Sequence, residues 1–175
     1  MFRNRVLFRA DLRGPEVIFE EGFHPRYTGG IIVHPGGQAT GGISTTKELL
    51  IAMDYAARYG GYVYAVVASG VDILEWLYQH HATQGAKANA MTQMEIHCNY
   101  IEANKIAFAR KAILVDGKLS FSDLLITNRM CIYPPEDLIR VRELFYWTGS
   151  LINLFISEYM KNFCLLQMFN MTEII

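Results

Sequence analysis

The sequence predicts a single domain of the α+β class, and three observations support this prediction. The chain has 175 residues, a length that suits one compact domain and leaves little room for two. Hydrophobic residues make up 51% of it and charged residues 19%, which provides a core and is too little charge for a disordered chain. Short β-branched and aromatic runs are interspersed with segments of helical periodicity, so both strands and helices are expected.

The first part of the chain indicates a strand, a helix and a loop. Residues 5–10 alternate between polar and apolar side chains, as a strand does. Residues 15–21 predict a short helix, because Pro15 stands in its first turn, an acid lies near its start and Gly22 follows it. Residues 24–42 are rich in glycine and hold two prolines, and we expect a mobile loop there.

The next segment predicts a short strand end followed by a helix. Residues 42–46 form the strand end, and we expect Thr45 or Thr46 to cap a helix over about 47–59. The inner face of this helix is predicted to carry aliphatic and small side chains at helical spacing, namely Leu49, Leu50, Met53 and Ala56 or Ala57.

The middle of the chain holds its strongest strand signal, at residues 62–68, which are aromatic and β-branched. A short helix is expected over 72–81. Residues 82–92 are small and polar, and we expect another loop there. Further strands are predicted at 96–100 and 107–115, separated by a turn around residues 102–105.

The last part of the predicted domain, residues 134–175, looks helical. Pro134, Pro135 and two acids open a helix that extends to about Trp147. Residues 150–169 are rich in Leu, Ile, Phe and Met, which fits either a packed terminal helix or an amphipathic helix on a membrane surface. Packing is the favoured alternative, because aromatic and methionine side chains at helical spacing are usually core, so membrane contact is the less favoured one.

Charge and motif patterns exclude several function classes. The chain has 16 Lys and Arg against 17 Asp and Glu, a net charge of −1, which argues against a nucleic-acid binder with a broad basic surface. The three cysteines are too scattered for a disulfide scaffold or a zinc site, and the adjacent His80 and His81 do not have metal-pair spacing. No glycine pattern opens a helix after a strand in the manner of a Rossmann dinucleotide site.

Compartment signals are sparse. No apolar stretch of about 7–15 residues typical of a signal peptide precedes Asp11, and no apolar run reaches the roughly 18 residues that a membrane span needs. Scattered cysteines favour reduced thiols in a reducing compartment.

Three segments together carry the functional signal. They are residues 7–23 (LFRADLRGPEVIFEEGF), 42–46 (GISTT) and 93–95 (QME). In this order and spacing they resemble the Arg–Ser–Glu class of mono-ADP-ribosyltransferase toxins, especially the branch of the pertussis toxin catalytic subunit. Residues 63–68 and 101–106 are similar to strands of that family as well, so the resemblance covers about residues 5–115.

The resemblance implies an ADP-ribosyltransferase-like fold, with two small packed antiparallel or mixed sheets and flanking helices that form a cleft for NAD. It implies transfer of ADP-ribose from NAD to a protein, with release of nicotinamide and with no metal. The bond between nicotinamide and ribose breaks through an oxocarbenium-like transition state, which a nearby carboxylate stabilises. Glu95 takes that role by resemblance.

The resemblance also assigns roles to the neighbouring motif residues. Arg9 is expected to hold a phosphate of NAD, since a guanidinium offers forked donors and stays charged. Ser44 is expected to orient Glu95, Gln93 to face the acceptor, and His34 to position the ribose or activate the acceptor. The expected NAD-binding set is completed by residues next to these positions, namely Ala10, Asp11, Thr45 and Thr46.

The acceptor and the route to it follow from the same resemblance. Glutamine at position 93 favours acceptors other than arginine, such as cysteine or asparagine, and the target is expected to be a host protein, for example a small signalling protein or ubiquitin. The loop at 34–42 lacks the cysteine of the secreted relatives, so the usual activation by disulfide reduction is not expected. With no signal peptide seen, we expect a secreted toxin or, in preference, an effector injected into the host cytosol. Two alternatives remain open: an NAD glycohydrolase, and a non-catalytic interaction module of the same fold.

Overall fold

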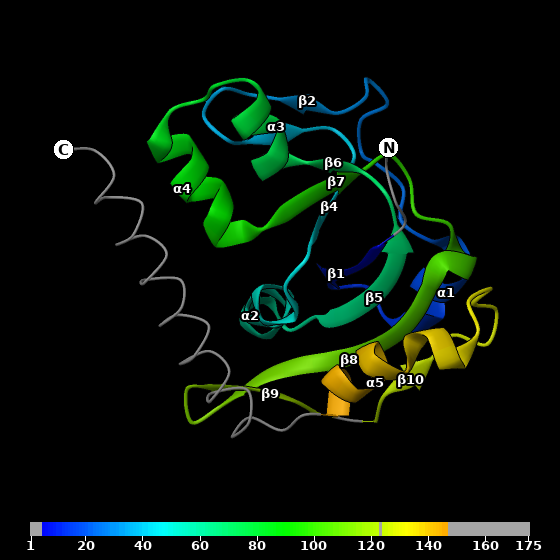
Figure 1. Cartoon of the computed structure of the whole chain (residues 1–175). Coiled ribbons are helices and arrows are strands. Elements are labelled where there is room, and N and C mark those ends of the chain that lie inside the picture. Colours follow the sequence, from blue (N-terminus) through cyan, green and yellow to red (C-terminus); the bar gives the residue numbers. More distant parts are fainter. Residues whose placement is uncertain (1–4, 123, 147–175) are drawn as a thin grey trace.

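The computed structural model describes residues 5–122 and 124–146 and has the α+β architecture that the sequence predicts (Figure 1). Its main strands are β1 (Arg5–Asp11), β4 (Ile43–Thr46), β5 (Tyr62–Ala68), β6 (Val71–Asp72), β7 (Glu95–Cys98), β8 (Ile106–Val115), β9 (Lys118–Phe121) and β10 (Ile126–Thr127). Its helices are α1 (Pro15–Glu21), α2 (Leu49–Tyr59), α3 (Ile73–Gln79), α4 (Gln84–Gln93) and α5 (Ile139–Tyr146), with short 3-10 turns at Ala103–Lys105 and Pro135–Leu138.

The main sheet consists of two antiparallel halves. One half has the order β10-β8-β5-β1, with β9 paired to the far end of β8, and the other has the order β4-β7-β6. β1 pairs with β5 along its full length, from Arg5 opposite Ala68 to Asp11 opposite Tyr62. β1 meets β4 at a single residue pair, Phe8 opposite Thr46. The two halves therefore share a single paired position in the strand ladder.

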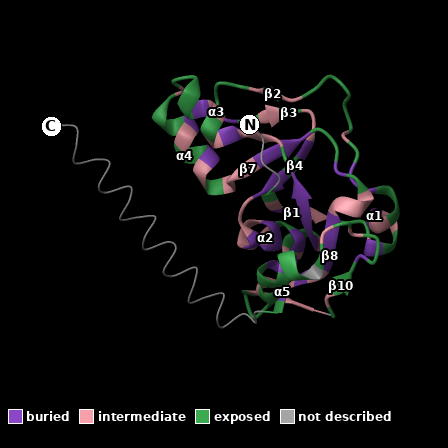
Figure 2. Ribbon diagram, turned by 45° about the vertical axis from the view of Figure 1, so that its right-hand side comes forward, coloured by how far each residue is buried: buried purple, intermediate pink, exposed green. Residues whose placement is uncertain are grey.

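Apolar side chains fill both sides of the larger half, and Figure 2 shows the buried strands between exposed helix faces. On one side, α2 and α5 cover a cluster that includes Phe8, Val63 and Phe108. On the other side, a second cluster joins Leu7 and Tyr64 of the larger half to side chains of β4 and β7. Because this second cluster draws on both halves, it packs the two sheets against one another, as the fold prediction requires.

Most predicted elements are confirmed. The strands at 5–10, 62–68 and 107–115 are β1, β5 and β8, and the helix predicted over 15–21 is α1. Gly22 ends α1 at a φ of +75°, and a Cβ on it would lie 2.4 Å from the carbonyl oxygen of Ile101. Glycine is required at this position by backbone conformation and by space.

The loop predicted over 82–92 is wrong, because this segment is the helix α4. The hydroxyl of Thr83 accepts a hydrogen bond from the backbone N–H of Ala86 and so caps the helix. Ala86 and Ala90, one helical turn apart, are buried against Ile73 and Leu77 of α3. Small side chains allow this close packing. Because these side chains are also weakly hydrophobic, apolar periodicity did not predict the helix.

The predicted threonine cap of α2 is also wrong. Thr45 and Thr46 belong to β4, and the residue before the helix is Glu48, whose side chain makes no capping bond. The hydroxyl of Thr45 donates to the carbonyl of Ile96, and that of Thr46 donates to the carbonyl of Gln93. Both hydroxyls therefore tie β4 to the segment that contains β7.

Residues 24–42 contain a short hairpin, β2 (Ile32–Val33) and β3 (Ala39–Thr40), within the predicted loop. Val33 and Ala39 of this hairpin pack against the α3–α4 cluster. Cys98 and Cys131 are not joined in a disulfide. Residues 147–175, with the apolar run at 150–169, lie outside the described residues. Within the part of the chain that the structure describes, no helix is both long enough and apolar enough to cross a bilayer.

Candidate active site

A cleft of about 190 Å³ lies where the two sheet halves meet. β1, β4 and α2 contribute to its walls, and the end of α4 and the start of β7 complete them. The lining residues are Phe8, Arg9, Ala10, Ser44, Thr45, Thr46, Ile51, Ala52, Tyr55, Gln93 and Glu95. Seven of the residues that the sequence singled out are in this set, although they come from separate parts of the chain.

A larger cavity, of about 330 Å³, is lined by residues that include Arg5, Asp72 and Trp76. It holds none of the predicted site residues, and two of its charged groups, Arg5 and Asp72, already pair with one another. The smaller cleft is therefore the candidate active site, since charged groups with altered ionisation converge there.

Glu95 is the carboxylate of the cleft. The pairing of β4 with β7 places Thr46 opposite Glu95 and Ser44 opposite His97, so all four side chains lie on one face. The hydroxyl of Ser44 donates a hydrogen bond to Oε1 of Glu95. Burial disfavours the charged form of Glu95, but the contacts with His97 and Ser44 outweigh it, and the pKa of Glu95 lies below its usual value. Glu95 is therefore ionised at neutral pH.

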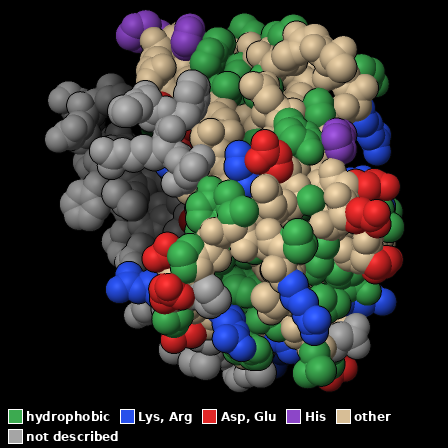
Figure 3. All heavy atoms as spheres, turned by 90° about the vertical axis from the view of Figure 1, so that its right-hand side faces the viewer, with side chains coloured by type: hydrophobic (Ala, Val, Ile, Leu, Met, Phe, Trp, Pro, Cys, Tyr) green, Lys and Arg blue, Asp and Glu red, His purple; other side chains and the backbone are tan. Residues whose placement is uncertain are grey.

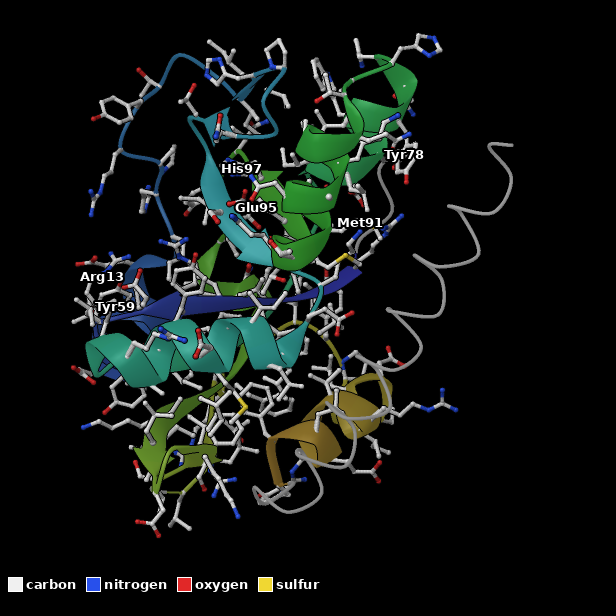
Figure 4. All side chains as sticks on the ribbon, turned by 90° about the vertical axis from the view of Figure 1, so that its left-hand side faces the viewer. Arg13, Tyr59, Tyr78, Met91, Glu95 and His97 are labelled. Atoms are coloured by element: carbon white, nitrogen blue, oxygen red, sulfur yellow. The ribbon has the colours of Figure 1, made fainter. Side chains whose placement is uncertain are left out.

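His97 is a site residue that the sequence analysis did not single out. Its Nε2 lies 2.9 Å from Oε1 of Glu95, in an ion pair whose N–H direction is off the line to the oxygen. Its Nδ1 lies 2.8 Å from the carbonyl oxygen of Gly41. Figure 4 shows the two labelled side chains next to one another on β7. The spacing Glu95-Ile96-His97 on a strand was the available signal, since alternate residues share a face.

Arg9 supports the cleft from β1. Its Nη1 donates to the carbonyl oxygen of Ser44 at 2.6 Å, and its Nη2 lies 3.3 Å from Oδ2 of Asp11. Its guanidinium carbon stands 5.0 Å from the ring centre of Phe23, a cation–π contact. The Nε of Arg9 is buried and finds no hydrogen-bond acceptor among the described residues. This buried donor on a cation is a feature that an anionic ligand would satisfy.

Asp11 connects two arginines rather than lining the cleft. Oδ1 accepts from Nε of Arg13 at 2.9 Å, and Oδ2 accepts from Nη2 of Arg13 at 3.0 Å. Burial opposes the ionisation of Asp11, but the hydrogen bonds from Arg13 and the charge of Arg9 hold its pKa below the usual value. Arg13 also lies over the ring of Phe23, 5.7 Å from its centre. The first motif therefore folds into one arginine–carboxylate–aromatic cluster.

Gln93 and Glu95 are brought to the cleft by a turn between α4 and β7. Gln93 is the last residue of α4, Met94 has a left-handed φ of +47°, and Glu95 begins β7. The hydroxyl of Thr46 donates to the carbonyl of Gln93, and the N–H of Lys47 donates to the carbonyl of Met94. These two bonds hold the turn against β4.

His34 lies outside the cleft. Its ring Nε2 is 3.2 Å from the hydroxyl oxygen of Thr40 across the β2–β3 hairpin, and its side chain is exposed. The hydroxyl of Thr45 is turned toward the carbonyl of Ile96, so Thr45 meets the cleft mainly with its backbone. A role for His34 in positioning the ribose or the acceptor stays a prediction. The glycine-rich segment instead contacts the site indirectly. The carbonyl oxygen of Gly41 contacts the ring of His97, and His97 contacts Glu95.

No family model matches the sequence, and no curated protein matches it significantly. Solved structures do match. The structure named EcPltA is 18% identical, covers 75% of this chain and 89% of its own, and has a TM-score of 0.56. Scabin toxin from Streptomyces scabies in complex with NADH is 21% identical over 77% of this chain and 80% of its own, with a TM-score of 0.53. A guanine-specific ADP-ribosyltransferase is 22% identical over 77% and 82%, with a TM-score of 0.54.

The chain has the fold of the ADP-ribosyltransferase toxins. Its cleft also carries groups that suit a dinucleotide with a positively charged nicotinamide. Arg9 offers a cation with an unsatisfied donor, and Glu95 is a fixed anion. Ser44 and His97 both contact Oε1 of Glu95, and Oε2 accepts no hydrogen bond from the residues at 5–122 and 124–146. That oxygen is available to a ligand hydroxyl. Among the same residues, no three His, Cys, Asp or Glu side chains gather as a metal site.

Proposed function

We propose that this chain is a mono-ADP-ribosyltransferase of the bacterial toxin or effector type, using NAD as co-substrate. The observation that carries the proposal is the convergence of Arg9, Ser44 and Glu95 in one cleft of this fold, with the carboxylate ionised and held by Ser44. Structural neighbours with the names Scabin toxin and guanine-specific ADP-ribosyltransferase support it at the level of the fold.

The residues divide the work of bond cleavage between them. In the reaction, the C1′–N bond of NAD breaks, its electron pair leaves with nicotinamide, and positive charge develops on the ribose. Oε2 of Glu95 accepts a hydrogen bond from a ribose hydroxyl, and the carboxylate charge stabilises the developing cation. Arg9 neutralises phosphate charge from the opposite wall. The acceptor then attacks C1′ and loses its proton.

A protein side chain is the acceptor that we favour. The net charge is −1, and on the face seen in Figure 3 basic and acidic side chains are interspersed without a broad basic area, as a protein target allows. Gln93, next to Glu95 in the cleft, favours an acceptor other than arginine, such as cysteine or asparagine on a small host signalling protein or ubiquitin. We also propose a relation to the pertussis toxin branch and delivery by secretion or injection into the host cytosol.

The test compares the chain with Glu95→Gln and a control, Glu102→Gln, which removes an exposed carboxylate outside the cleft. Each is incubated with biotin-labelled NAD and eukaryotic lysate, with and without nuclease, and nicotinamide release is measured. We expect a discrete protein band from the chain and the control, and a loss of at least about 100-fold in Glu95→Gln.

Other outcomes identify the alternatives. Label on nuclease-sensitive material would make a nucleobase the acceptor. Glu95-dependent nicotinamide release without any labelled macromolecule would indicate an NAD glycohydrolase. Binding of NAD without any release, even with lysate present, would contradict the proposal and favour the non-catalytic module.

A further inference from the structure

Next to the carboxylate of the cleft lies a buried histidine that the proposed mechanism does not use. His97 contacts the same oxygen of Glu95 that Ser44 contacts, and it is anchored on its other side by the backbone of Gly41. We propose that His97, as an imidazolium, is a positioning residue for Glu95, which holds Oε1 so that Oε2 faces the ribose. This inference rests on the proposed transferase function and assigns it a further residue.

The hydrogen-bond geometry fixes where the protons are. The carbonyl oxygen of Gly41 can only accept, so Nδ1 of His97 carries a proton. If that were the only proton on the ring, Nε2 would present a lone pair to a carboxylate oxygen 2.9 Å away, and the contact would be repulsive. The contact is attractive when Nε2 is protonated as well. His97 and Glu95 then form a buried ion pair.

The surroundings of His97 leave Glu95 as its dominant partner. Burial lowers the pKa of His97, but the contacts with Glu95 and Gly41 raise it by more. The pKa of His97 therefore lies above its usual value. Arg9 on β1 opposes protonation more weakly. The strands on either side place no charge opposite His97, since β4 presents Ser44 and β6 presents Val71.

Among the described elements, α3 also packs on β7, and its Ile73 and Leu77 are buried and uncharged. Its acid, Glu75, binds Gln79 at the surface. Asp72, next to Val71 on β6, is paired with Lys47 and Arg5. The protonation of His97 is therefore tied to Glu95 and responds little to the rest of the molecule.

This arrangement predicts a pH dependence with a definite sign. The imidazolium is present below the raised pKa of His97 and is lost as pH rises through it. Nε2 and Oε1 then repel one another, and Glu95 leaves the position that Ser44 and His97 impose. We expect kcat to fall as pH rises through the raised pKa of His97, while KM for NAD changes little, because Glu95 acts mainly in the transition state.

Two substitutions separate the two bonds of the imidazole. In His97→Asn, the shorter amide can replace Nδ1 and keep the bond to Gly41, but it cannot reach Glu95. In His97→Gln, the longer amide places a donor near the position of Nε2 and keeps the contact with Glu95 at every pH. We expect kcat in His97→Asn to fall by about 10- to 100-fold. We expect His97→Gln to retain most of kcat and to lose the alkaline decline.

The opposite order would overturn the inference. If His97 acts only by holding the loop at Gly41, then His97→Asn keeps kcat and His97→Gln loses it. Nicotinamide release is the readout for each variant, measured from pH 5.5 to 9 beside the unsubstituted chain. If release depends on Glu95 but His97→Asn matches the unsubstituted chain, this inference fails and the proposed function stands.

A second readout does not depend on turnover. The imidazole of His97 is titrated by NMR in the unsubstituted chain and in Glu95→Gln, and its signal is assigned by its absence in His97→Asn. We expect the titration midpoint to be lower in Glu95→Gln, because the carboxylate charge is gone. An unchanged midpoint would overturn the inference even if the enzyme is active. A lowered midpoint without any nicotinamide release would instead remove the proposed function and leave only the ion pair.

Discussion

Asp11 links the two arginines of the first sequence motif, residues 7–23, by contacting both Arg9 and Arg13. It accepts hydrogen bonds from Arg13 with both carboxylate oxygens and contacts Arg9 as well, while both guanidinium groups lie over Phe23. Its side chain is only 11% exposed, so solvent screens these charges weakly. Arg9 in turn donates to the backbone of Ser44, which contacts Glu95. An acid outside the cleft thereby supports the geometry of the carboxylate inside it.

We expect Asp11→Asn to lower the free energy of unfolding at pH 7 by about 1.5–3 kcal/mol, because two charge-assisted hydrogen bonds are weakened in a half-buried place. The pKa of Asp11 is lowered in the folded state, so this contribution is present above the unfolded value of about 3.8 and is lost as pH falls through the folded pKa. Urea denaturation at several pH values measures it.

The control for this prediction is Asp54→Asn. Asp54 pairs with Arg58 on α2, and both side chains are well exposed, at 40% and 65%. This change is expected to cost less than about 0.5 kcal/mol. Equal effects of the two substitutions on the free energy of unfolding at pH 7 would contradict the prediction that the buried contacts of Asp11 stabilise the fold more than an exposed ion pair does.

At the same scale, the motif residues could be predicted, whereas for His97 the sequence indicated only that it shares a strand face with Glu95. Arg9, Ser44 and Glu95 stand in the order and spacing on which the resemblance to ADP-ribosyltransferase toxins is based, so their convergence was foreseeable from the sequence. The importance of His97 depends on a bond to Gly41, 56 residues away, and on a strand register that brings Ser44 opposite it. The resemblance pointed to His34 as the histidine of the site, but in the structure its ring contacts Thr40 across the β2–β3 hairpin.

At the scale of elements, the turns around the helices decide where the site residues lie. Gly22 ends α1 and lets Phe23 form an isolated bridge with Ile101, which fixes Phe23 under the two arginines. Met94 ends α4 in the left-handed region and starts β7 at Glu95. In both cases a single residue of positive φ separates a helix from a residue of the site.

We expect Gly22→Ala to destabilise the fold by about 1–3 kcal/mol or more, because the new Cβ would meet the Ile101 carbonyl and the φ of +75° is strained for alanine. Gly85→Ala is the matched change, since Gly85 lies inside α4 with open space around it. It is expected to stabilise by about 0.5–1 kcal/mol. Thermal and urea unfolding of both variants give the comparison, and effects of the same sign would contradict it.

Elements with a strong local pattern were predictable, and elements that depend on a partner were not. β5 is aromatic and β-branched apart from Ala65 and Ala68, and α1 has its proline, acid and glycine signals in sequence. α4 has small polar residues, so it is held by its Thr83 cap and by α3, which no local pattern reveals. The hydroxyls of Thr45 and Thr46 donate to carbonyl oxygens about 50 residues later in the chain, and that of Thr46 also accepts a hydrogen bond from the backbone N–H of Glu48, just before α2.

At the scale of the whole molecule, α5 closes the core beneath the larger half of the sheet. Phe145 on α5 is fully buried, with its ring centre 5.4 Å from Phe121, 6.1 Å from Phe8 and 6.3 Å from Phe108. Strand β1 and the consecutive strands β8 and β9 therefore meet at one side chain of α5. The packing of this region belongs to the fold as a whole.

We expect Phe145→Ala to cost about 3–5 kcal/mol of unfolding free energy, the usual effect of truncating a buried phenylalanine. Ile139→Ala on the same helix is the control, because Ile139 is 52% exposed and is expected to change stability by no more than about 0.5 kcal/mol. Chemical denaturation followed by circular dichroism measures both. A small effect at Phe145 would mean that α5 is not an essential part of the core.

The two halves of the sheet meet at a single backbone pair between β1 and β4, beside the cleft. A dinucleotide held there would contact Arg9 on one half and Glu95 on the other, so its affinity and the angle between the halves would be thermodynamically coupled. Any change that favours one angle would then alter the binding of NAD without touching it. If the proposed function holds, the apolar cluster shared by the two halves, which includes Leu7, Tyr64 and Ile96, would be a remote determinant of substrate affinity.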